Sequence, residues 1–63
     1  MDRNLEYLLD SFTDRIKMLS DALSRGNCAD IEEYRYTCGQ IRGLEAACRI
    51  VQDLESNLEN IDD

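Results

Sequence analysis

A regular stripe of apolar residues that ends at a glycine restricts this chain to very few folds. Early in the sequence, apolar side chains recur at alternating intervals of four and three residues: Leu5, Leu9, Phe12, Ile16, Leu19 and Leu23. This is the a/d spacing of a heptad repeat, which places these residues on one side of an α-helix. Arg25-Gly26-Asn27 ends the pattern, because glycine readily takes the left-handed conformation that follows a helix. The sequence predicts a helix from about residue 3 to residue 25, capped by Asp2 or Asn4.

A second periodic stretch begins after this turn and continues almost to the last residue. Apolar or small residues recur every three or four positions: Ile31, Tyr34, Cys38, Ile41, Leu44, Cys48, Val51, Leu54, Leu58 and Ile61. Their mean spacing is shorter than the helical period, so the stripe drifts around the helix, and two of its faces are predicted to be buried. Asn27 can cap a helix that starts at residue 28, while Asp30 and Glu33 form an alternative capping box. We expect this helix to run from about residue 28 to about residue 60.

Two helices joined by a short turn at residues 25–27 are antiparallel neighbours. The predicted fold is all-α: a single two-helix antiparallel hairpin over residues 1–63, with a longer second helix. The second helix extends about ten residues past the first at the usual helical rise. Because nothing in the same chain covers that extension, we predict a partner interface there, at Val51, Leu54, Leu58 and Ile61. A chain of 63 residues also builds a marginal core, so oligomerisation or docking on a partner is expected to complete the fold.

Small residues in the second helix indicate a close neighbour. Gly39, Gly43, Ala46 and Ala47 lie on adjoining turns. Each glycine inside a helix costs about 1 kcal/mol relative to alanine unless the space that it leaves is used. We interpret these four residues as helix-packing positions, with contact to a ligand as the alternative.

The chain is acidic, with 14 Asp or Glu against 7 Lys or Arg. Three arginines recur every seven residues along the second helix: Arg35, Arg42 and Arg49. Antiparallel pairing brings Arg42 near Asp10, so interhelical ion pairs are predicted; an anion site formed with Tyr34 and Tyr36 is the alternative. The basic residues are too scattered for the footprint that phosphate binding requires, so a nucleic-acid partner is not expected.

The sequence lacks the residues that most catalytic sites use. It contains no His, which excludes His-based acid–base and nucleophilic chemistry and most zinc sites; we expect neither an enzyme nor a cofactor or metal. Cys28, Cys38 and Cys48 lie ten residues apart, about 15 Å along a helix, which is too far for an intrachain disulfide. No apolar run has the length of a signal peptide or a membrane span, so neither secretion nor a membrane location is expected.

One part of the second helix resembles a known group of proteins. Residues 34–54 resemble the Tyr-x-x-x-x-Gly-x-Ile-x-Gly-Leu-x-x-Ala core of very short, uncharacterised helical proteins of tailed bacteriophages. The pattern is carried here by Tyr34, Gly39, Ile41, Gly43, Leu44 and Ala47. This resemblance implies a phage protein of the virion or the host cytoplasm. A virion-associated or assembly component, such as a capsid or neck accessory, is the expected role, through contacts with itself or with a larger phage or host protein.

The predicted architecture supplies two alternatives. Its length and hairpin form resemble the Rop family of plasmid copy-number regulators, whose hairpins dimerise into four-helix bundles; this resemblance implies an RNA-binding dimer. The net charge of −7 is also compatible with an acidic inhibitor that occupies the nucleic-acid groove of a basic host protein.

Overall fold

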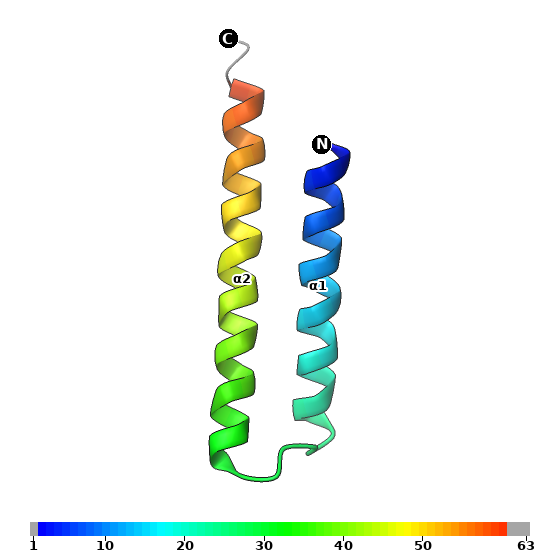
Figure 1. The fold of residues 1–63 in the computed structure, drawn as a ribbon, viewed down its shortest axis with the longest axis vertical. Coiled ribbons are helices and arrows are strands. Elements are labelled where there is room, and N and C mark those ends of the chain that lie inside the picture. Colours follow the sequence, from blue (N-terminus) through cyan, green and yellow to red (C-terminus); the bar gives the residue numbers. More distant parts are fainter. Residues whose placement is uncertain (1, 61–63) are drawn as a thin grey trace.

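The chain is a hairpin of two helices that lie side by side and run in opposite directions (Figure 1). In the computed structural model, α1 spans Arg3–Ser24 and α2 spans Ile31–Asn60. The structure describes the backbone of residues 2–60 and the side chains of residues 2–58. Within these residues there is no β-strand. The predicted all-α hairpin with a longer second helix is confirmed.

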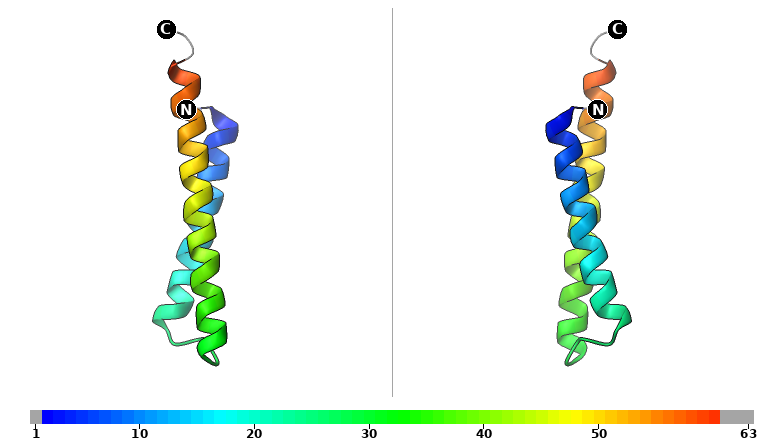
Figure 2. Two further views of the ribbon diagram at one scale, coloured as in Figure 1. Left: turned by 90° about the vertical axis from the view of Figure 1, so that its left-hand side faces the viewer. Right: turned by 90° about the vertical axis from the view of Figure 1, so that its right-hand side faces the viewer.

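The hairpin is a single layer, one helix thick. Views from its two edges show α1 and α2 crossing at a small angle, with no other described element over either face of the layer (Figure 2). Its principal extents are 51 × 17 × 13 Å. The radius of gyration is 14.9 Å, against about 11 Å for a compact domain of this length. The chain is therefore far from globular.

Asp2 caps the start of α1, as one of the two predicted caps. Its carboxylate accepts hydrogen bonds from the backbone N–H groups of Asn4, at 2.8 Å, and Leu5, at 3.3 Å. These are donors that the first turn of a helix leaves without an intrahelical partner.

A Schellman motif ends α1 at the predicted glycine. Gly26 has φ +70°, the left-handed conformation that only glycine adopts without strain. Its N–H donates to the carbonyl of Leu23, and the N–H of Asn27 donates to the carbonyl of Ala22, both at 3.1 Å. This is the hydrogen-bond pair that defines the motif.

The second helix begins three residues later than residue 28, at Ile31. Asn27 belongs to the exit of α1, since its N–H is bound to Ala22. The alternative capping box forms instead: the Asp30 carboxylate accepts from the N–H of Glu33 at 2.8 Å. The Glu33 carboxylate accepts from the N–H of Ala29 at 2.9 Å. The connection therefore runs from residue 25 to residue 30, longer than the predicted turn.

One continuous interhelical seam holds the two helices together. In α1 it contains the half-buried predicted stripe: Leu5, Leu9, Phe12, Ile16, Leu19 and Leu23. In α2 it contains buried and half-buried residues with the same four-and-three spacing: Thr37, Ile41, Leu44, Cys48, Val51 and Glu55. Thr37 satisfies its hydroxyl within the helix by donating to the Glu33 carbonyl at 2.9 Å.

The seam buries very little of the chain. Val51, at 8% exposure, is the only buried apolar side chain among the described residues, and none of these residues is fully buried. Ile31 and Tyr34, which belong to the predicted stripe of the second helix, are exposed. Both lie in the first turn of α2, directly after the connection.

We predict that Asp30→Ala lowers the free energy of unfolding by about 1 kcal/mol, because Glu33 loses its capping acceptor. Urea unfolding followed by circular dichroism at one fixed protein concentration measures this change. Asp53→Ala is the matched control, since Asp53 is an exposed aspartate in the interior of the same helix. An equal loss in both variants would contradict the capping role.

Candidate functional site

The two broad faces of the hairpin differ in their chemistry. In each helix, the residue before a seam residue is turned about 100° to one side of the seam, and the residue after it about 100° to the other. Because the two right-handed helices are antiparallel, the residues that precede seam residues lie on the same side of the hairpin in both. We call this side the front face and the opposite side the back face.

The front face carries almost no charge. Its residues are Asn4, Leu8, Ser11, Arg15, Met18 and Ala22 from α1, and Tyr36, Gln40, Gly43, Ala47, Ile50 and Leu54 from α2. Arg15 is the single charged residue among these twelve positions. Charged residues make up 33% of the whole chain, so the front face has a much lower fraction of charged residues than the chain as a whole.

The back face has the composition of an ordinary solvated surface. Its residues are Glu6, Asp10, Thr13, Lys17, Ser20 and Ser24 from α1, and Cys38, Arg42, Glu45, Arg49, Gln52 and Ser56 from α2. Six of these twelve positions are charged, three in each helix. The contrast between the two faces singles out the front face as the surface where a partner would be buried.

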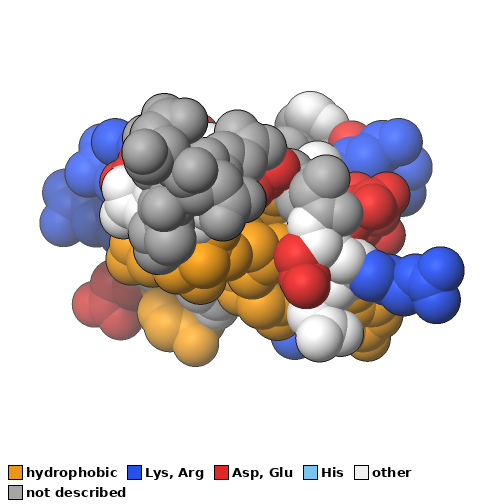
Figure 3. Space-filling model, turned by 90° about the horizontal axis from the view of Figure 1, so that it is seen from above, with side chains coloured by type: hydrophobic (Ala, Val, Ile, Leu, Met, Phe, Trp, Pro, Cys, Tyr) orange, Lys and Arg blue, Asp and Glu red, His pale blue; other side chains and the backbone are white. Residues whose placement is uncertain are grey.

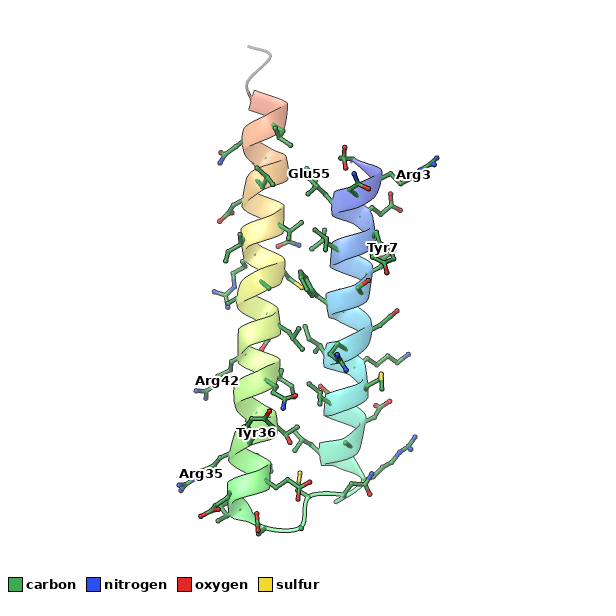
Figure 4. All side chains as sticks on the ribbon, in the orientation of Figure 1. Arg3, Tyr7, Arg35, Tyr36, Arg42 and Glu55 are labelled. Carbon is green, nitrogen blue, oxygen red and sulfur yellow. The ribbon has the colours of Figure 1, made fainter. Side chains whose placement is uncertain are left out.

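The figures show this asymmetry directly. Seen from above, apolar side chains gather along the side of the molecule that faces the viewer in Figure 1, and they cover both helices there (Figure 3). Tyr36 lies on the viewer's side of α2, and Tyr7 lies at the outer edge of α1 (Figure 4). The apolar surface is therefore shared between α1 and α2.

Most of the large exposed apolar side chains of the described residues belong to the front face or its borders. Five of the nine are front-face residues: Leu8, Met18, Tyr36, Ile50 and Leu54. Tyr7 borders the face, and Leu58 continues the seam line of α2 beyond α1. Only Ile31 and Tyr34 lie elsewhere. Tyr36 is 69% exposed and Leu54 is 47% exposed, so this face has no cover within the hairpin.

The predicted partner interface divides into two parts. Val51 belongs to the seam, because the later start of α2 lets α1 cover the second helix up to about Glu55, which lies level with Arg3 (Figure 4). Leu54 is an exposed residue of the front face, and Leu58 is exposed on the seam line of α2 beyond the end of α1. Ile61 lies outside the described residues.

The predicted helix-packing residues are mostly turned away from α1. Ala47 is half-buried beside the seam, whereas Gly39, Gly43 and Ala46 are exposed. A Cβ atom built on Gly39 or Gly43 would meet nothing within 4 Å. Within the described residues, the hairpin does not use the space that these glycines leave.

The arginine row does not join the helices. Arg35 and Arg42 point away from α1 (Figure 4), and Arg49 is exposed. Among the described residues, none of the three forms an ion pair, so the predicted contact of Arg42 with Asp10 is wrong. Tyr34 and Tyr36 point about 200° apart around α2, so they cannot both line one anion site with these arginines.

Sequence reasoning missed Met18, Tyr36 and Ile50 as members of one surface. Met18 directly precedes Leu19 of the predicted first stripe, whereas Tyr36 and Ile50 precede residues whose place in the seam is known only from the structure. The stripe that the sequence predicts for α2 mixes seam residues with Cys38 of the back face and Leu54 of the front face.

The described side chains offer little for chemistry. No group of three or more His, Cys, Asp or Glu among them is placed to hold a metal ion. Cys28, Cys38 and Cys48 are free, as predicted from their spacing, and all three are half-buried. In the described part of the chain, neither helix has an apolar stretch that would span a bilayer. Comparison with protein-family models, curated proteins and solved structures finds no match to this chain.

We predict that Arg42→Ala changes the free energy of unfolding by less than about 0.5 kcal/mol, as is usual for an exposed residue without a partner. Leu44→Ala, at the neighbouring seam position, should lower it by about 2 kcal/mol or more through lost burial. Urea unfolding of both variants provides the comparison. If Arg42→Ala lowered the free energy of unfolding by more than about 1 kcal/mol, the interhelical ion pair predicted from the sequence would be supported after all.

Proposed function

We propose that this chain is a non-enzymatic helical interaction protein whose front face binds another protein surface. The observation that carries the proposal is the contrast between the two faces, with one charged residue in twelve positions on the front and six in twelve on the back. A solvated helix surface gains nothing from excluding charge, and contiguous exposed apolar surface on a small protein is typical of an interaction site.

The cellular setting in this proposal is the assembly of a bacteriophage particle. Support comes from the resemblance of residues 34–54 to short phage proteins, and from the position of that segment on α2, which supplies half of the front face. Gly43 and Ala47 of the resembling pattern are front-face residues, and Leu44 is a seam residue. The resembling pattern thus includes both residues that hold the hairpin together and residues that would contact a partner.

Quantitative mass spectrometry of purified particles tests the assembly role. The expected result is that the chain copurifies with particles through density-gradient and size-exclusion steps, at a fixed ratio to the major capsid protein. A chain that is abundant in the infected-cell lysate and absent from washed particles would contradict this role.

A matched pair of tyrosine variants tests the surface. We predict that Tyr36→Arg, on the front face, reduces recovery of the chain with particles at least about tenfold, because a buried unpaired charge costs several kcal/mol. Tyr34→Arg introduces the same charge two residues earlier, outside the front face, and should leave recovery unchanged. Circular dichroism confirms that both variants keep their helical content. Equal recovery of the two variants would show that the front face is not the binding surface.

A further inference from the structure

The accessible surface of the chain is larger than its mass requires. It measures 5179 Å² for 7.3 kDa, whereas a compact monomer of this mass exposes about 4,200 Å². The excess of about 1,000 Å² is close to the area that one partner contributes to a standard protein–protein interface. The hairpin thus has enough uncovered surface for one partner of about its own size.

The charge of the front face limits the kind of partner. The chain has a net charge of −7, yet none of its acidic residues is among the twelve front-face positions. A basic partner would find no carboxylates to pair with on this face. A second copy of the chain, packed front to front, meets a surface on which Arg15 is the single charged residue of the twelve positions, and keeps its acidic residues in solvent.

The order of side-chain sizes along α2 favours an antiparallel pair. Tyr36 and Leu54 lie nine residues on either side of position 45, and Gly43 and Ala47 lie two residues on either side of it. A two-fold contact requires that if one residue faces another, the reciprocal contact is also made. If the two-fold axis passes position 45 of both copies, Tyr36 of one copy faces Leu54 of the other at each end of the contact. Gly43 of one copy then faces Ala47 of the other where the helices cross.

We infer that a second copy of this chain covers the front face, with α2 of the two copies antiparallel and crossing at Gly43 and Ala47. This inference deepens the proposed function, since it names the partner on the same surface. Tyr36 of each copy packs on Leu54 of the other. The open space at Gly43, where a Cβ would meet nothing, lets the two helices approach closely at the crossing.

Gly43→Leu distinguishes this dimer from a solitary hairpin, because the two arrangements predict opposite effects of the substitution. In a solitary hairpin, Gly43→Leu fills open space and raises helix propensity, so it stabilises. In the inferred dimer it overpacks the crossing and weakens dimerisation at least about tenfold. Gln52→Leu adds a leucine on the back face and is the control, with no loss of dimerisation expected.

Light scattering coupled to size exclusion, together with thermal unfolding, reads out this comparison. The native chain and Gln52→Leu should have twice the 7.3 kDa of one chain, and Gly43→Leu should have less at the same concentration. A native chain with the mass of a monomer, or a Gly43→Leu variant that melts higher with unchanged mass, would overturn the inference.

Cysteine cross-linking tests the orientation. In a chain whose three native cysteines are replaced by alanine, Tyr36→Cys and Leu54→Cys are prepared as separate variants, mixed, refolded together and oxidised. The antiparallel dimer predicts a disulfide-linked dimer in the mixture and none with either variant alone, because a disulfide requires Cβ atoms about 4 Å apart. Cross-linking of Leu54→Cys with itself would show parallel copies and overturn the stated arrangement.

The result also separates this inference from the proposed function. A monomeric chain that still loses particle association on Tyr36→Arg overturns the second copy and leaves the interaction role intact. A dimeric chain that is absent from particles overturns the assembly role and leaves the dimer intact.

Discussion

Two helices in one layer can bury only the stripe that each presents to the other, and this limit governs the whole molecule. The seam consists of a four-and-three repeat in both helices, and yet Val51 is the only buried apolar side chain among the described residues. The conformational entropy lost on ordering some sixty residues is of the order of the total gain from burial even in well-packed domains. A hairpin with so small a core would gain stability from further burial, and the front face offers surface with a single charged residue for it.

Local hydrogen bonding at the connection determines how the helices align. Gly26 and Asn27 complete the Schellman motif, and Asp30 with Glu33 starts α2. Both arrangements could be predicted from the sequence, because each has a local signature. What could not be predicted was which of two competing caps would be used. Asn27 donates its N–H to the end of α1, so α2 starts at Ile31, and its register against α1 shifts by about one turn.

That shift explains most of the differences between prediction and structure. It moves the end of the overlap from Val51 to about Glu55 and turns Arg42 away from Asp10. The first stripe, from Leu5 to Leu23, was correct residue by residue, because one heptad phase fits all of it. For α2 the sequence predicted two buried faces, and the hairpin buries one of them, the seam. Assigning Leu44 to the seam and Gly43 to the front face required the observed phase of the helix.

The proposed interaction role and the inferred dimer use the same property of the chain, a front face that has no acidic residue and only one charged residue, Arg15, on an acidic protein. Their common claim is that the hairpin is stabilised by burial between chains. The most direct measurement is the melting temperature of the native chain over a concentration range of about 1 µM to about 1 mM, where a folded dimer gains stability by mass action. The account predicts a melting temperature that rises steadily with concentration. A melting temperature independent of concentration, together with a monomer mass throughout that range, would contradict it.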